Sequence, residues 1–384
     1  MIKRKKFRGL SLFSNVGVSE ALLNSVNSEI TIANEIDNRR CNFYKYVYPN
    51  VKMINGDIRN REIFNSIVSE SLKMNVDFII ATPPCQGMST VGKQDSFDKR
   101  NQLISYAVDI IKKIKPKYIL LENIPQQLRT HIRVQNSKIL IPNYIKKILK
   151  NDYHINDSVI NAADYGVPQI RKRSLFLLTR RDLSEEFEFL NDDEFVDHIN
   201  LSKSIGRLPS LDPKIQEFNL KEQLDYFPQY SKKIEDGVKI SKWHRPPLHK
   251  LRHVKVMMHT QEGQSALLNK KIFPINKNGT RIKGYKNTYR RQLWDRPAYT
   301  VTTYNGAVCS QDNVHPGRQI LLKNKKIQSD PRVFSIYELL IVMSIPQNWS
   351  MPVWANDSLI RHSIGEGLPP LIVQKLFKKL LKLP

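Results

Sequence analysis

One cysteine stands where the sequence could place a nucleophile. The apolar run Phe78 to Ala81 predicts a short buried strand, and residues 83–86 after it read Pro-Pro-Cys-Gln. Prolines cannot continue a strand ladder, so they end the strand and fix the backbone that presents Cys85. Reactive groups of α/β sheets lie at the carboxyl ends of strands, and a thiolate there can attack carbon. The pattern therefore favours covalent catalysis by Cys85 over a buried structural cysteine.

An acid and two arginines also flank predicted strands. Glu122 comes directly after a strand predicted over 117–121, and Arg171 and Arg173 come just before one predicted over 174–179. A buried carboxyl group can hold a proton at neutral pH, and arginines can bind carbonyl oxygens or anions. The alternatives are a carboxylate at a helix start for Glu122 and solvated loop charges for the arginines.

Three consecutive predicted strands end in groups suited to an adenosine pocket. The strand at 10–13 runs into a turn with one glycine, Gly17, which is typical of a nucleotide cradle. Glu35 ends the next strand, about 20 residues on, where a carboxylate can bond ribose hydroxyls. Asp57 follows the third strand, at 51–54. An ordinary turn and surface carboxylates are the alternatives for each feature taken alone.

Strands and helices alternate over the first 180 residues, which predicts the fold class. Strand patterns fall at 10–13, 29–35, 51–54, 77–81 and 117–121, and 154–161 with 174–179 indicates a β-pair. Helical patterns include 103–113, 335–344 and 370–381, and we expect the first turn to open a helix near Ser19. The alternation predicts an α/β fold with a doubly wound sheet, followed by an irregular second domain.

The charge is high and unevenly distributed. The formal net charge is +25 over 384 residues. Residues 231–294 hold sixteen Lys or Arg and three acidic residues, whereas 182–200 hold eight acidic residues and no Lys or Arg. Contacts to phosphates release counterions, so this distribution favours a nucleic-acid partner over charge that serves solubility alone. No apolar stretch reaches the roughly 20 residues of a membrane span, so we expect a cytoplasmic protein with no membrane partner.

Cysteine and histidine usage argues against metal. The three cysteines are widely spaced and odd in number, which disfavours a disulfide framework or a zinc site. Because zinc usually takes cysteine as well, we expect phosphate contacts or solvated surface for four histidines of the basic region, His244, His249, His253 and His259.

Taken together, the three signatures at 83–86, 122–124 and 169–173 resemble those of the cytosine-5 DNA methyltransferase family, of the bacterial restriction–modification type. They occur in the family's order and at a similar spacing. Residues 86–93 resemble the family's mobile catalytic loop, and 296–303 and 364–370 resemble two late elements of the family. The resemblance implies a Rossmann-like, S-adenosylmethionine-dependent catalytic domain formed by 1–182 and 294–384. It also implies a smaller target-recognition domain at 200–293 and an acidic linker at 183–199.

The resemblance also implies a mechanism. Cys85 would add to C6 of a cytosine flipped out of duplex DNA, and Glu122 would supply a proton at N3. Arg173 would bond the O2 atom, and Arg171 would hold the geometry beside it. S-Adenosyl-L-methionine would supply the methyl group for C5 and leave as S-adenosyl-L-homocysteine, with no metal.

The remaining site residues follow from the same resemblance. Those implied for the cofactor are Phe13, Gly17, Glu35, Ile36, Asp57, Ile58 and Pro83. Those implied for the substrate are Gln86, Ser89, Val91 and Gln169. We expect a monomer that acts on double-stranded DNA, paired with a restriction endonuclease of the same site but not in a stable complex with it.

Three positions depart from the family pattern, and two other functions stay open. The first loop usually has glycine where Asn15 and Val18 stand, and the C-terminal element usually has asparagine where Glu366 stands. One alternative is a tRNA cytosine-5 methyltransferase, which the large basic insertion disfavours. The other is a non-catalytic DNA-binding relative, which the retention of Cys85 and Glu122 disfavours.

Overall fold

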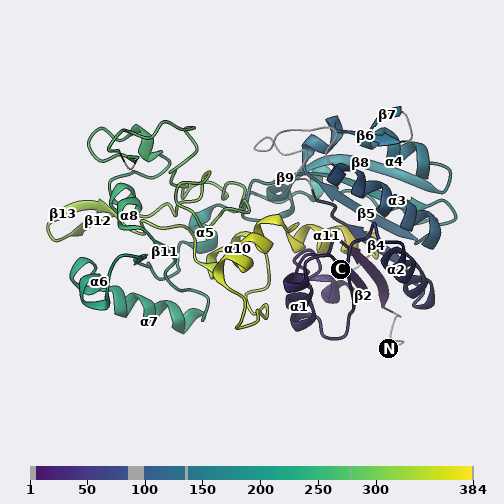
Figure 1. Ribbon diagram of the computed structural model, residues 1–384, viewed down its shortest axis with the longest axis horizontal. Helices are drawn as coiled ribbons and strands as arrows, with labels where there is room; N and C mark the ends of the chain where they lie inside the picture. The colour runs from purple at the N-terminus through teal and green to yellow at the C-terminus, as the bar shows by residue number, and fades with distance from the viewer. Residues whose placement is uncertain (1–5, 85–98, 135–136, 277, 383–384) are drawn as a thin grey trace.

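The computed structural model describes residues 6–84, 99–134, 137–276 and 278–382, which form two lobes (Figure 1). The larger lobe holds a seven-stranded sheet with helices on both faces. The smaller lobe holds short helices and a β-hairpin. The C-terminal segment returns from the smaller lobe to the sheet, so both ends of the chain contribute to the larger lobe.

The central sheet has the strand order β3-β2-β1-β4-β5-β9-β8. Its strands are β1 (Phe7–Leu12), β2 (Ser28–Glu35), β3 (Lys52–Asn55), β4 (Phe78–Ala81), β5 (Tyr118–Asn123), β8 (Tyr153–Asn161) and β9 (Lys172–Arg180). The first five in this order pair in parallel, and β9 runs antiparallel to both β5 and β8. Parallel strands covered on both faces read as continuous apolar runs, as β4 does from Phe78 to Ala81. The predicted α/β fold is confirmed.

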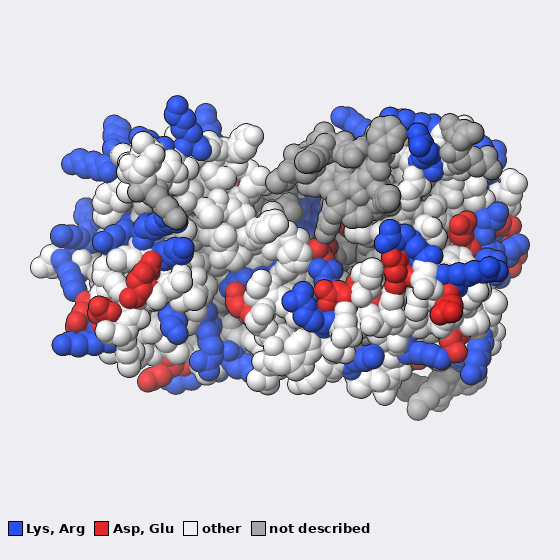
Figure 2. Space-filling model, in the orientation of Figure 1, with Lys and Arg blue, Asp and Glu red and all other residues white. Residues whose placement is uncertain are grey.

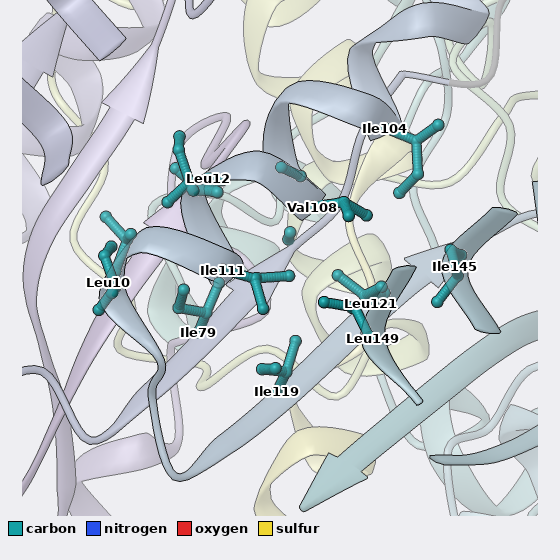
Figure 3. Close-up of a cluster of buried hydrophobic side chains, with 14 of the residues drawn as sticks. Leu10, Leu12, Ile79, Ile104, Val108, Ile111, Ile119, Leu121, Ile145 and Leu149 are labelled. Atoms are coloured by element: carbon teal, nitrogen blue, oxygen red, sulfur yellow. The ribbon is translucent and has the colours of Figure 1, made fainter. Parts of the chain in front are cut away.

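Two apolar cores cover the two faces of this sheet. One face packs against α2 (Arg61–Lys73), α3 (Leu103–Ile114) and α4 (Ile141–Leu149). Figure 3 shows this core, in which α3 side chains meet strand residues such as Ile79 and Leu121. The other face packs against α11 (Pro370–Leu380), with Tyr44 of α1 (Asn38–Val47) in the same core. The ends of the chain are thus held together by buried apolar surface.

One helix expectation was wrong. In place of a helix near Ser19, the chain forms successive turns and a short 3₁₀ helix, η1 (Leu23–Val26). The turn amides bond three residues back, as from Glu20 to the carbonyl of Gly17. Glu20 is buried and accepts a hydrogen bond from the Tyr44 hydroxyl, and burial raises the pKa of this carboxyl group to about 7. These contacts outweigh the local helical pattern.

The smaller lobe contains more regular structure than the sequence indicated. Its helices are α5 (Leu201–Ile205), α6 (Leu220–Tyr226), α7 (Tyr230–Ile240) and α8 (Leu251–Met258), and its strand pairs are β10 (Lys214–Ile215) with β11 (Leu248–His249) and β12 (Gln319–Leu322) with β13 (Lys325–Gln328). Side chains from both ends of this region, such as Ile215 and Ile327, share one apolar cluster. The domain boundaries given above stay a prediction.

Further elements complete the larger lobe and the junction. They are the hairpin β6 (His131–Val134) and β7 (Ser137–Leu140), the helices α9 (Ile336–Val342) and α10 (Asp357–Glu366), and the 3₁₀ helices η2 (Lys99–Gln102), η3 (Pro125–Arg129), η4 (Ala162–Tyr165) and η5 (Asp192–Glu194). A further 3₁₀ helix, η6 (Ala266–Leu268), packs with α8 in the smaller lobe. Within the described residues, no helix has the length and apolar character needed to cross a membrane.

A buried ion network ties the two lobes together. The guanidinium of Arg332 lies 2.7 and 2.9 Å from the two carboxylate oxygens of Glu338 on α9 and 2.8 Å from Asp330. Asp330 also accepts a hydrogen bond of 2.9 Å from the amide of Leu211, which follows α5 in the smaller lobe. Buried charges are stable only when they are paired, so removing any one of these groups would leave another buried charge without its partner.

Candidate active site

The carboxyl end of β5 and the start of β9 bring Glu122 and Arg173 together. Ala81 pairs with Leu121 in the parallel β4–β5 ladder, and Glu122 pairs with Leu175 of β9. Pro83, predicted to line the cofactor pocket, is buried at the end of β4. The predicted nucleophile and three predicted substrate contacts, Cys85, Gln86, Ser89 and Val91, lie outside the described residues.

Glu122 and Arg173 form a buried pair. The Nε atom of Arg173 lies 2.8 Å from Oε1 of Glu122, and both side chains are largely withdrawn from solvent. Burial raises the pKa of Glu122, while the charges of Arg173 and Arg171 oppose the shift. A carboxyl group with a raised pKa retains its proton at a higher pH, as a proton donor requires. The geometry therefore suits the role that the sequence predicted for Glu122.

Two neighbours that the sequence left without a role hold the turn in place. The side chain of Asn123 donates a hydrogen bond of 3.0 Å to the carbonyl of Pro83, and its oxygen accepts one of 2.8 Å from the amide of Ile124. The hydroxyl of Thr82 donates one of 3.1 Å to the carbonyl of Phe13. The backbone that leads into Cys85 is thus fixed to β5 on one side and to the first loop on the other.

Arg171 serves a different part of the site from Arg173. Its guanidinium is fully buried and lies 2.8 Å from the carbonyl of Val301, 2.8 Å from that of Gly365 and 3.0 Å from that of Gly367. The direct bond to Glu122 comes from Arg173 instead. Arg171, directly before β9, therefore joins this part of the chain to the two late elements that the family resemblance singled out.

Gln169 is also fully buried and bonded within the protein. Its amide nitrogen lies 3.3 Å from the carbonyl of Val342, and its amide oxygen accepts a hydrogen bond of 3.0 Å from the amide of Val301. A substrate contact by Gln169 stays a prediction. In the structure, Gln169 connects the loop before β9 to α9.

Glu35, the carboxylate predicted to bind ribose, already accepts hydrogen bonds from backbone amides. Oε1 of Glu35 accepts hydrogen bonds of 2.8 and 2.9 Å from the amides of Ile36 and Asp37, and Oε2 accepts one of 3.0 Å from that of Asn15. A carboxylate has about four acceptor positions, so room for one hydroxyl remains. Ile36 is exposed beside Glu35, which suits contact with a ligand.

The other predicted cofactor residues surround the same edge of the sheet. Phe13 and Gly17 both have positive φ, and a Cβ atom at Gly17 would lie 2.2 Å from the ring of Tyr48, so only glycine fits there. Asp57 is held in a two-pronged ion pair by Arg59, which lowers the pKa of its carboxyl group. Ile58 is buried behind it. An adenine amino group would have to share Asp57 with Arg59.

The expectation for the histidines was wrong at two positions. His244 is buried and bonds to the hydroxyl of Ser335 and the carbonyl of Pro209, each at 2.9 Å. His249 accepts a hydrogen bond of 3.2 Å from the amide of Val333, and burial lowers its pKa to about 3. Both are packed inside the lobe and are neither surface nor phosphate contacts. Among the residues that the structure describes, no cluster of His, Cys, Asp or Glu could hold a metal ion.

Comparison with known proteins gives matches that span nearly the whole chain. A model of the family described as C-5 cytosine-specific DNA methylase matches residues 7–382. The Type II methyltransferase M1.HgaI of Avibacterium volantium is 38% identical over 383 residues, covering 98% of this chain and 99% of its own. The Type II methyltransferase M.DdeI of Desulfomicrobium norvegicum is 26% identical, covering 97% and 87%.

Solved structures agree in fold. A DNA modification methyltransferase encoded within an E. coli prophage superimposes with a TM-score of 0.66 at 20% identity, covering 98% of this chain and 99% of that one. A DNMT2 variant of Spodoptera frugiperda superimposes with a TM-score of 0.60 at 17% identity, covering 98% and 99%. At these identities the likeness establishes the fold alone.

Proposed function

Because this chain belongs to the C-5 cytosine-specific DNA methylase family, we propose that it methylates C5 of a cytosine flipped out of duplex DNA, through a covalent bond between Cys85 and C6. Membership of the family confirms the resemblance drawn from the sequence, and the chain is accordingly a DNA cytosine-5 methyltransferase. The covalent step, the flipped base and the residue roles are the proposal.

The observation that carries the proposal is the buried Glu122–Arg173 pair beside the end of β4. Addition of a thiolate at C6 places negative charge on the pyrimidine ring, and a protonated Glu122 would neutralise it at N3. Arg173 would hold Glu122 in position and donate to the O2 atom with its remaining N–H groups. A base stacked inside a duplex cannot reach this pair, so the target must leave the stack.

The residues at the strand ends fit the methyl donor of the family. Glu35 keeps an acceptor position for a ribose hydroxyl, and the oxygen of the buried Asn15 side chain has no hydrogen-bond partner among the described residues. Phe13, Gly17, Ile36, Asp57, Ile58 and Pro83 would line the rest of the pocket. When bound, S-adenosyl-L-methionine supplies an electrophilic methyl group, and the chain's part is to orient it toward the base and to exclude water.

The charge of the smaller lobe suits the DNA backbone. Figure 2 shows Lys and Arg side chains spread over this lobe, with fewer acidic ones among them. Exposed basic residues here are Lys232, Lys239, Lys242, Arg245, Lys250, Arg252, Lys255, Lys270, Lys271, Arg281, Lys283 and Lys286. Lys203, Arg207 and Arg318 also line a hollow of about 560 Å³ beside α5. Not every basic residue is available, because Arg291 is fully buried and bonds to backbone carbonyls.

We further propose that the protein acts in a restriction–modification system, because these relatives are named Type II methyltransferases. The protein would be a monomer in the bacterial cytoplasm. It would protect one DNA sequence from a restriction endonuclease without forming a stable complex with that enzyme. DNA is favoured over tRNA because the matching family is described as a DNA methylase.

The test is methyl transfer from tritiated S-adenosylmethionine to unmethylated DNA and to tRNA, followed by bisulfite sequencing of the labelled product. We expect label in DNA alone, at one recurring sequence. Label in tRNA alone would identify tRNA as the substrate instead of DNA. Label in neither would favour the non-catalytic alternative.

A further inference from the structure

The departures from the family pattern meet each other in space. The side-chain nitrogen of Asn15 lies 3.0 Å from the carbonyl of Ser363 and 3.4 Å from Oε2 of Glu366, both on α10. Val18 packs against Gly367, where an added Cβ atom would lie 2.6 to 2.7 Å from the valine side chain. Both unusual residues of the first loop therefore contact the C-terminal element. Asn15 adopts a φ of 50°, a left-handed conformation that asparagine tolerates better than most residues.

A charged pair lies at this contact. Oε2 of Glu366 is 2.8 Å from a guanidinium nitrogen of Arg40 on α1, and Oε1 is 2.9 Å from Nε2 of His362. The Arg40 and Glu366 side chains are 19% and 26% exposed, so the pair is sheltered but open to a ligand. The 2.8 Å contact is made by Nη1 of Arg40, and a guanidinium has five N–H donors in all.

The pair is connected to the predicted ribose ligand. The backbone amide of Asn15 donates to Glu35, while its side chain reaches Glu366. Asn15 thus lies between the place for the adenosine half of a donor and the charged pair. The side-chain oxygens of Asn15 and Ser363 are buried and have no hydrogen-bond partner among the described residues. Buried polar atoms of this kind are expected to meet a ligand or ordered water.

We propose that Asn15, Arg40 and Glu366 form a clasp that recognises the zwitterionic amino-acid end of the methyl donor. Arg40 would bind its carboxylate, Glu366 its ammonium group, and the oxygen of Asn15 would accept a second ammonium hydrogen. Both contacts to charge are charge-assisted hydrogen bonds, which are shorter and stronger than neutral ones. This assignment rests on the proposed function, since it presumes that the pocket takes the sulfonium donor.

The clasp would contact only the amino-acid end of the ligand. Calorimetry with one ligand that has this end and one that lacks it can therefore measure the clasp's contribution to binding. S-Adenosylhomocysteine carries the amino-acid end, whereas 5′-methylthioadenosine lacks it. For Glu366→Gln and for Arg40→Gln, we expect the Kd of S-adenosylhomocysteine to rise roughly tenfold, which corresponds to about 1.4 kcal/mol. The Kd of 5′-methylthioadenosine should change less than about twofold. Arg39→Gln is the matched control, because Arg39 is an exposed neighbour that pairs only with Asp37 among the ion pairs described.

Each outcome has a distinct meaning. Equal weakening of both ligands, or no weakening of either, would overturn the clasp while leaving the methyltransferase assignment in place. If the unaltered protein bound neither ligand and transferred no methyl group, the proposed function itself would fail. Thermal denaturation of each variant without ligand identifies any change that acts through folding.

A second set of variants tests the pairing within the clasp. Asn15→Gly and Glu366→Asn each restore the residue that is usual in the family. Because Asn15 contacts Glu366, their combined effect on S-adenosylhomocysteine binding should be smaller than the product of the separate fold-changes. Strict additivity would contradict the contact.

Discussion

The substitution Arg171→Lys tests whether the more buried of the two arginines stabilises the fold or acts on the substrate. The guanidinium of Arg171 lies 2.8, 2.8 and 3.0 Å from the carbonyls of Val301, Gly365 and Gly367. An ammonium group is a single point and cannot reach all three. Loss of two such bonds, at roughly 1.5–3 kcal/mol each, would lower the free energy of unfolding by roughly 3–6 kcal/mol. That is a large part of the roughly 5–15 kcal/mol typical of a folded protein.

Urea denaturation followed by tryptophan fluorescence measures this loss. Arg173→Lys is the control, because lysine can keep the ion pair with Glu122 and no bond to the late elements is at stake. We expect Arg173→Lys to lower methyl transfer far more than stability, and Arg171→Lys to lower stability first. The structural role of Arg171 would be refuted by a different result. In that result, the free energy of unfolding of Arg171→Lys would stay within about 1 kcal/mol of that of the unaltered protein, while turnover was lost as in Arg173→Lys.

Three further changes probe the site and the surface. Glu122→Gln should lower the rate of methyl transfer roughly 10²- to 10⁴-fold. Because burial raises the pKa of Glu122, the protein's own rate should fall as pH rises through that pKa, and the glutamine variant should lack this decline. Asn123→Ala removes the bond to Pro83 and should lower kcat roughly tenfold with donor binding unchanged in calorimetry; a selective change in donor Kd would argue against this role. Lys203→Glu with Arg207→Glu should weaken DNA binding and reduce the salt dependence of log Kd by about one unit per lost phosphate contact; an unchanged slope would show that these residues do not touch phosphate.

The sheet was predictable because its physics is local. The run Phe78 to Ala81 is apolar at every position, as a strand buried on both faces requires, and it forms β4 with the predicted end. The helix expected near Ser19 failed for the opposite reason. Glu20 has its hydrogen-bond partner on α1, and no local pattern contains that contact.

The site divides in the same way. Glu122 and Arg173 flank predicted strands, so their proximity followed from the order of elements. The partners of Arg171 could not be foreseen, because they lie 130 to 196 residues further along the chain. Asn123 was visible within a signature, but only the structure connects its side chain to Pro83. Glu366 and Asn15 each appeared as isolated departures, and their contact gives them a shared explanation.

The most direct test of the account is to trap the bond between enzyme and base. DNA containing 5-fluorocytosine at the target position should block release, since fluorine cannot leave C5 as a proton does. Mass spectrometry of the digested complex should place the nucleotide on the peptide that contains Cys85, and Cys85→Ala should give no adduct and no methyl transfer. An adduct on another residue, or methyl transfer by Cys85→Ala, would contradict the account.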